Sequence, residues 1–199
     1  MNRRIGFISA AVNLAAVLGF ALCMPFGWLF GCYFCSMFIA FGFVGMACAY
    51  AHYAVPERRV AGYAALAFAA MYVILILLVY FTQLTAVRTG GLTEQAAALL
   101  DFQQMGLFFS LDLLGYALMS LSTFFAGLTL CPCNRPGKWL KALLLIHGMF
   151  FFSCLLMPLL GVFQADSPAF IGILVLEVWC AYFAPVSVLS LLHFRGQAA

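Results

Sequence analysis

Six long apolar stretches constrain the fold of this chain more than any other feature of its sequence. They run roughly over Ile5–Met24, Trp28–Ala51, Val60–Val87, Phe102–Leu130, Trp139–Val162 and Ala169–Leu192. Each is long enough to cross a bilayer, which takes ~20 apolar residues in a helix. A bilayer offers no water to backbone groups, so each span must be helical. The sequence predicts one all-α domain over 1–199, a polytopic membrane bundle of six transmembrane helices.

The composition excludes a water-soluble protein. Apolar residues make up 67% of the chain and charged residues 8%, whereas soluble domains are about half apolar and a quarter charged. Eight cysteines do not indicate a disulfide scaffold, since that interpretation applies to short, polar, secreted chains. Inside helices, cysteine behaves as a small hydrophobe.

The basic residues predict the orientation. Eight of the nine lysines and arginines fall on one side of a six-span chain, and only Arg88 falls on the other. Basic residues mark the cytoplasmic side of membrane proteins, so we expect both termini in the cytoplasm and the chain in the cytoplasmic (inner) membrane. The net charge of +3 is then a topology signal, and no nucleic-acid partner is needed to explain it.

The longest connection lies between the third and fourth spans. Thr93 precedes a helix-forming run that begins at Glu94, which predicts a capped short helix in this external loop. Such a loop can be a lid over a binding site or a plain surface connector.

Three ionisable residues lie within the spans: Asp112, His147 and Glu177. Charge inside a membrane is costly, so these residues are functional candidates by default and are expected to face the bundle interior. Asp112 and Glu177 each lie about 12–15 Å below the outer boundary at 1.5 Å per residue, and His147 lies near the midplane. The three are able to meet in one polar cavity that opens outward.

Helical spacing adds polar neighbours to this set. Tyr116, Ser120, Thr123 and Gly127 follow Asp112 within one narrow stripe, which lipid cannot satisfy. Tyr72, Tyr80 and Gln83 share one face of the third span. We predict a ligand site formed by Asp112, Glu177, His147, Tyr116 and Gln83, with the last two as orienting hydrogen-bonders.

The groups that pair with the two carboxyls decide their role. No lysine or arginine lies deep in any span. Each acid is therefore neutral and bonded to tyrosine or serine, paired with His147, sharing a proton with the other acid, or bound to a cation. The first outcome is structural, and the other three make a site for protons, metal ions or amine-bearing ligands.

No catalytic or metal motif stands out. Cys32 and Cys35 have CxxC spacing but no flanking histidine, and Cys131-Pro132-Cys133 has no second thiol pair. We attribute both patterns to chance and expect no metal and no cofactor. Hydrolase, membrane-protease and nucleotide-loop signatures are absent, so enzymatic activity is uncertain and less expected than its absence.

In layout the chain resembles uncharacterised six-span bacterial integral membrane proteins, and no motif here is specific to a family of known activity. Its size and span count also resemble the substrate-binding subunits of energy-coupling vitamin transporters, whose small-residue pattern on the first helix is loosely echoed by Ala11-Val12-Asn13-Leu14-Ala15. Neither resemblance supplies functional residues.

Three functions follow as hypotheses. The first is binding or translocation of a small ligand, cationic or proton-coupled, through the outward-facing cavity. The second is a non-catalytic accessory or assembly protein with structurally buried acids. The third is an intramembrane enzyme that uses Asp112, Glu177 and His147. The expected partners are the lipid bilayer and an unknown small molecule, and the sequence leaves the oligomeric state open.

Overall fold

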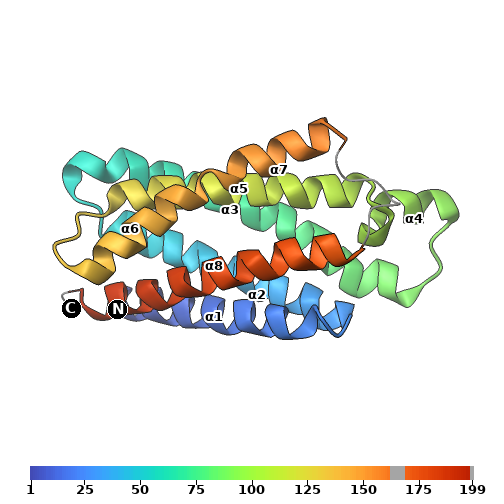
Figure 1. Cartoon of the computed structure of the whole chain (residues 1–199), viewed down its shortest axis with the longest axis horizontal. Helices are drawn as coiled ribbons and strands as arrows, with labels where there is room; N and C mark the ends of the chain where they lie inside the picture. Colours follow the sequence, from blue (N-terminus) through green and yellow to red (C-terminus); the bar gives the residue numbers. More distant parts are fainter. Residues whose placement is uncertain (162–168, 198–199) are drawn as a thin grey trace.

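The structure, a computed structural model, describes residues 1–161 and 169–197. Eight α-helices in this part of the chain form a bundle (Figure 1). The long helices are α1 (Asn2–Cys23), α2 (Leu29–His52), α3 (Arg59–Thr82), α5 (Leu107–Thr129), α6 (Arg135–His147), α7 (Phe150–Leu159) and α8 (Ala169–Arg195). The shorter elements are η1 (Pro56–Arg58), the π-helical η2 (Gln83–Val87), α4 (Glu94–Leu100) and η3 (Phe102–Gln104).

Six stretches of helix are long and apolar enough to cross a membrane, which confirms the predicted fold class. They cover Asn2–Cys23, Leu29–His52, Pro56–Val87, Leu107–Thr129, Arg135–Leu159 and Gly172–Arg195. Large apolar side chains stand exposed around the bundle, among them Ile74 on α3 and Leu174 on α8. A soluble protein rarely exposes this much apolar surface, and lipid covers it without cost.

Two of the predicted spans differ from the observed helices. The fourth begins at Leu107 instead of Phe102, because Met105 adopts a left-handed backbone conformation (φ 52°) that separates η3 from α5. The fifth is interrupted between α6 and α7, where Gly148 and Met149 form turn-type hydrogen bonds to the carbonyls three residues earlier. The predicted end of the fifth span, Val162, lies outside the described residues.

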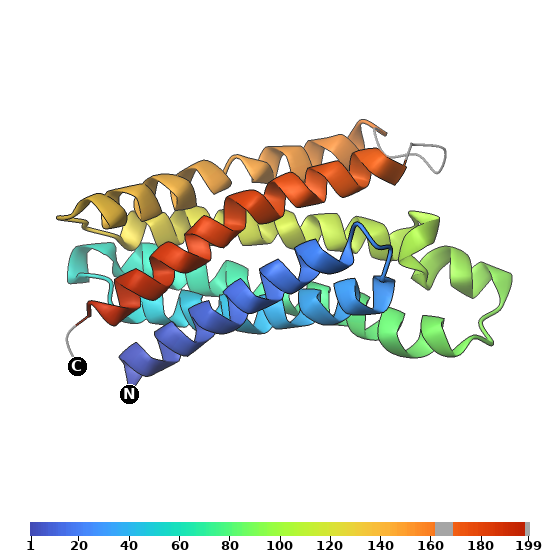
Figure 2. The same ribbon diagram turned by 60° about the horizontal axis from the view of Figure 1, so that its bottom comes forward.

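The helices form a closed ring of antiparallel neighbours (Figures 1 and 2). Around the ring, α1 packs on α2, α2 on α3, α3 on α5, and α5 on both α6 and α7; α8 closes the ring by packing on α6 and α1. This order places the first and last helices side by side.

Helices α1 and α2 approach each other closely. A Cβ atom at Gly42 would lie 2.7 Å from the backbone nitrogen of Asn13, so only glycine fits at this crossing. Asn13 is fully buried; its amide donates to the Ile39 carbonyl over 2.8 Å and accepts from Ser187 of α8 over 2.8 Å. These bonds join α1, α2 and α8, as small and polar residues commonly do between membrane helices.

Both termini lie at the same end of the bundle (Figures 1 and 2). We call it the basic end, because the helix ends that meet there carry Arg3, Arg4, Arg58, Arg59, Arg135, Lys138, Lys141 and Arg195. Arg58 donates to the carbonyls of Leu128 (2.9 Å) and Leu130 (2.6 Å), and Lys141 also donates to Leu130 (3.0 Å). These cations stabilise the C-terminal end of α5. Arg88 lies at the opposite end, which we call the Arg88 end.

Candidate functional site

Asp112 lies inside the bundle near the Arg88 end. It follows the first residue of α5 by five positions, or about 8 Å at 1.5 Å per residue. This depth is smaller than expected from the sequence because α5 begins later than the predicted span. The side chain is 5% exposed, and the stripe that follows it also faces inward: Ser120, Thr123 and Gly127 are buried.

Hydroxyl groups surround the Asp112 carboxyl. The Tyr80 hydroxyl of α3 lies close enough to interact with it and with Ser36 of α2. Tyr72 of α3 and Tyr116 of α5 lie close enough to the carboxyl to interact electrostatically. The rings of Tyr72 and Tyr116 pack together with centroids 5.9 Å apart. We call these five residues the Asp112 cluster.

Two buried atoms of the Asp112 cluster have no hydrogen-bond partner among the described residues: Oδ1 of Asp112 and the hydroxyl oxygen of Tyr72. Tyr72 is fully buried, and Asp112 nearly so. Buried polar groups in proteins are almost always paired. Two unpaired oxygens in one cluster therefore mark a place that can accept a proton or coordinate a cation.

No basic side chain among the described residues interacts with this carboxyl. Helices α2, α5 and α7 contain no lysine or arginine, and α3 and α8 have one each, Arg59 and Arg195, at the basic end. Arg88 packs its guanidinium 5.5 Å from the centre of the Phe30 ring and donates to the Leu84 carbonyl over 3.1 Å. The charge of Arg88 is thus used elsewhere.

Glu177 occupies a separate position on α8. It follows the first residue of this helix by eight positions, or about 12 Å. Its Oε1 atom is buried and has no hydrogen-bond partner in the part of the chain that the structure describes. Its carboxyl lies close enough to interact with the thiols of Cys32 on α2 and Cys180 on α8. Among the described residues, no interaction joins Glu177 to Asp112 or His147.

His147 is the last residue of α6, and both of its ring nitrogens form hydrogen bonds within the protein. Its Nε2 accepts from the indole N–H of Trp179 over 3.1 Å, and its Nδ1 lies 2.8 Å from the hydroxyl of Thr123. An indole N–H can only donate, so Nε2 carries no proton. The Thr123 hydroxyl donates to the Ser120 carbonyl over 2.8 Å, so it accepts from Nδ1–H. The imidazole is therefore neutral and makes no bond to either acid.

Gln83 holds the loop at the Arg88 end in place. Its amide nitrogen donates to the Leu100 carbonyl over 2.7 Å, and its amide oxygen accepts from the Phe102 N–H over 3.0 Å. Both ends of the amide are therefore used to fix the junction of α4 and η3. The expected cap of α4 is confirmed, since the Thr93 hydroxyl accepts from the Ala96 N–H over 3.3 Å.

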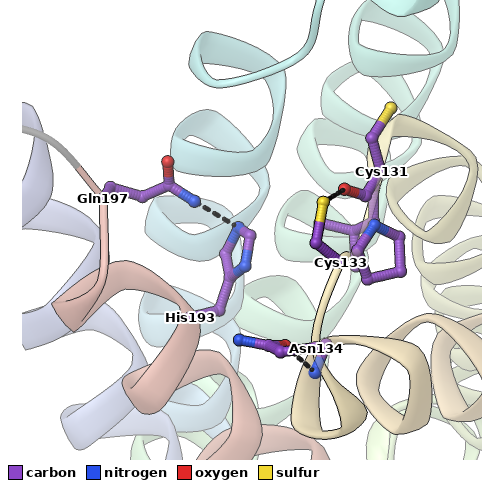
Figure 3. Close-up of a pocket in the computed structure, with 8 residues that line it drawn as sticks. Cys131, Cys133, Asn134, His193 and Gln197 are labelled. Carbon is purple, nitrogen blue, oxygen red and sulfur yellow. Dashed lines mark hydrogen bonds between the residues drawn. The ribbon is translucent and has the colours of Figure 1, made fainter.

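A pocket of about 180 Å³ opens at the basic end, between the start of α6 and the end of α8 (Figure 3). Cys131, Cys133, Asn134, His193 and Gln197 line it. The Cys131 thiol points away from His193 in Figure 3. No group of three or more histidine, cysteine or acidic side chains among the described residues is placed to hold a metal ion. This pocket does not border Asp112 or Glu177.

The structure thus brings Asp112 and Tyr116 together and leaves Glu177, His147 and Gln83 with other partners. Tyr72, Tyr80 and Ser36 complete the cluster around the acid. The common helical face of Tyr72 and Tyr80 is visible in the sequence, but nothing in the sequence indicates that this face meets α5. The sequence does not indicate the role of Trp179 either, because indoles in apolar helices commonly serve as packing or interfacial groups.

The fold and the apolar perimeter define this chain as a multi-pass helical membrane protein with a buried carboxyl among hydroxyl groups. No family of proteins, no curated protein and no solved structure matches the chain.

Proposed function

We propose that this protein of the cytoplasmic membrane binds a small cation, either a proton or an alkali-metal ion, at the Asp112 cluster. One observation carries the proposal: within residues 1–161 and 169–197, the buried Asp112 carboxyl has an oxygen without a partner and no basic side chain to neutralise it. An isolated carboxylate in an apolar interior is strongly unfavourable. A cation bound there restores neutrality.

The donor atoms favour a hard cation. The Asp112 cluster offers one carboxyl and the hydroxyls of Tyr72, Tyr80, Tyr116 and Ser36. The Cys154 thiol of α7 also lies close enough to interact with the carboxyl, so oxygen donors outnumber sulfur around it. Hard cations prefer oxygen ligands, whereas soft metals prefer sulfur and nitrogen. The unpaired Tyr72 hydroxyl adds a second oxygen that needs a partner. Both ring nitrogens of His147 already have hydrogen-bond partners. We therefore propose no direct proton transfer between His147 and Asp112.

The orientation we propose follows from charge. The basic end faces the cytoplasm, with both termini, by the preference of arginine and lysine for that side. The Asp112 cluster then lies in the half of the membrane that faces outward, beneath the segment of α4 and η3. Cation binding from the outer side, with or without translocation, is consistent with this position.

Thermal unfolding of the purified full chain in detergent tests the proposal. Sodium, lithium and potassium chloride are compared with N-methylglucamine chloride at equal ionic strength. If an alkali-metal ion binds the native protein, the melting temperature rises with its concentration, and Asp112→Asn removes this rise. If the cation is a proton, acidification stabilises the parent and not the variant, because only the folded parent then takes up an additional proton.

Glu177→Gln is the matched control, since Glu177 is a second buried-oxygen acid that interacts with different residues. It should keep the part of the parent's response that Asp112→Asn removes. A cation response that survives in Asp112→Asn would overturn the proposal. A parent that responds to no cation and to no change of pH, with Asp112→Asn melting lower, would instead favour an accessory protein with structurally buried acids.

A further inference from the structure

A cluster of four cysteines at the Arg88 end is not used by the site described above. Cys23 is the last residue of α1, Cys32 and Cys35 lie in the first two turns of α2, and Cys180 lies on α8. We call these four residues the thiol cluster. Three helices contribute to it, so their sequence positions alone do not reveal it.

Within the thiol cluster, the thiols of Cys23 and Cys35 lie close enough to interact across the contact of α1 with α2. Cys32 lies close enough to both to interact electrostatically, and it also faces Cys180 and Glu177. These interactions cross from α1 to α2 and are not confined to the CxxC pair of Cys32 with Cys35.

Two glycines make room for the paired sulfur atoms. A Cβ atom at Gly31 would lie 2.6 Å from the sulfur of Cys23, and one at Gly19 would lie 2.9 Å from the sulfur of Cys35. Side chains on a helix lean toward its N-terminus. In two antiparallel helices, Cys23 and Cys35 consequently lean toward each other, one from each side of this glycine-lined contact.

Burial separates the four thiols into two groups. Cys23 and Cys35 are half-buried, whereas Cys32 is 2% and Cys180 is 3% exposed. A small uncharged reagent in the detergent or bilayer can reach the first two. Cys48, which is exposed and lies toward the basic end of α2, provides a thiol outside the cluster for comparison.

We propose that Cys23 and Cys35 are a reversible dithiol–disulfide pair that exchanges with an external disulfide. One thiolate attacks the external disulfide, forms a mixed disulfide and releases one thiolate. The second cysteine thiolate attacks the cysteine sulfur of that mixed disulfide and releases the other thiolate. The two protons lost by Cys23 and Cys35 pass to the two released thiolates, so the external disulfide is reduced to two thiols as the pair is oxidised.

The position suits this chemistry. In the proposed orientation the Arg88 end faces the outside of the cytoplasmic membrane, where disulfides form and persist. The exchange itself requires only the contact of Cys23 with Cys35, and it does not depend on cation binding at Asp112. The two proposals can therefore fail separately.

The test uses the purified full chain in detergent with dithiodipyridine, a small uncharged disulfide, as the probe. Cys131→Ser and Cys133→Ser are introduced first, because these exposed neighbours at the basic end also react. Mass spectrometry of proteolytic peptides is expected to show the Cys23 and Cys35 peptides linked with the loss of two hydrogens, and no pyridylthio adduct at either cysteine. Dithiothreitol should reverse the change.

Single variants separate ring closure from simple modification. In Cys35→Ser the adduct on Cys23 should persist, since the thiol that we propose displaces it is gone. Cys48→Ser should leave the linkage of Cys23 with Cys35 unchanged from that of the background. Stable adducts on both Cys23 and Cys35 in the background would overturn the proposal, as would a disulfide that joins Cys32 to either Cys35 or Cys180.

Discussion

The contrast between His147 and Asp112 is clearest at the scale of single residues. Both are polar residues buried among apolar helices, and both are candidates from the sequence alone. His147 has a partner on each ring nitrogen, whereas Asp112 retains an unpaired oxygen. Burial alone does not distinguish these two residues, but the number of unpaired polar atoms does, and a buried unpaired atom calls for an explanation.

The bond from Trp179 to His147 gives a prediction at this scale. Trp179→Phe removes the indole N–H and leaves Nε2 of His147 buried without a donor. We expect a loss of about 1 kcal/mol in the free energy of unfolding, close to the typical value for bonds between membrane helices. Unfolding by sodium dodecyl sulfate in mixed micelles measures it.

Trp28→Phe is the control, because Trp28 is 59% exposed. It should change the free energy of unfolding little. Equal losses in the two variants would contradict the assigned bond and its role in holding α6 against α8.

Residue patterns predicted some of the Asp112 site and missed the rest for a physical reason. The helical stripe from Asp112 to Gly127 correctly indicated an inward face, since spacing along one helix is fixed by its own geometry. Which helix faces that stripe depends on packing between segments far apart in the chain. The partners Tyr80 and Ser36 therefore came only from the structure.

At the scale of elements, Gln83 connects the end of α3 to the junction of α4 and η3. It lies in the π-helical segment η2, and both of its amide atoms bond backbone groups of the loop. Gln83→Leu removes both bonds while keeping a side chain of similar size. Backbone amides over residues 94–104 should then exchange hydrogen faster, measured by mass spectrometry.

Thr82→Val is the comparison, since the Thr82 hydroxyl bonds within its own helix, to the Leu78 carbonyl. It should leave exchange over 94–104 unchanged. If Gln83→Leu also leaves it unchanged, then the loop is held by other contacts and the assigned role of Gln83 is wrong.

The contact of α1 with α2 provides a second prediction for elements. Gly42→Ala places a methyl group against the backbone of Asn13, where no flexible side chain can move aside. Overpacking of this kind typically costs about 1–3 kcal/mol, which sodium dodecyl sulfate unfolding would detect. Gly172→Ala on α8 is the control, because a Cβ atom there meets nothing within 4 Å. A cost no larger than that of the control would contradict the close approach.

At the scale of the whole molecule, the sequence predicted six membrane-crossing helices and the structure confirms them. Hydrophobic length decides this property, and it is local to each segment. The interruption between α6 and α7 and the late start of α5 escaped prediction. Between α6 and α7 the chain stays largely apolar around Gly148 while the backbone turns, so hydropathy alone gives no signal there. Before α5, Asp101, Gln103 and Gln104 interrupt the apolar run, and the predicted span began at Phe102, within this polar stretch.

The orientation is testable on the whole molecule in intact cells. Cys131 and Cys133 are exposed and lie next to the basic end, so we expect a membrane-impermeant maleimide to label them only after the membrane is permeabilised. In a background without these two cysteines, Thr89→Cys at the Arg88 end should react without permeabilisation. The reverse pattern would show that the basic end faces outward.

The central claim is that the Asp112 carboxyl exchanges a small cation inside the bundle. Infrared difference spectroscopy of the protein in liposomes tests it most directly, with spectra recorded as the sodium concentration or the pH is changed. The difference spectra of Asp112→Asn are subtracted from those of the parent. We predict a carboxyl band that changes between its protonated and ionised forms, or shifts on binding sodium, and that is missing from the variant. A parent spectrum that does not respond, or a response that the variant retains, would contradict the claim.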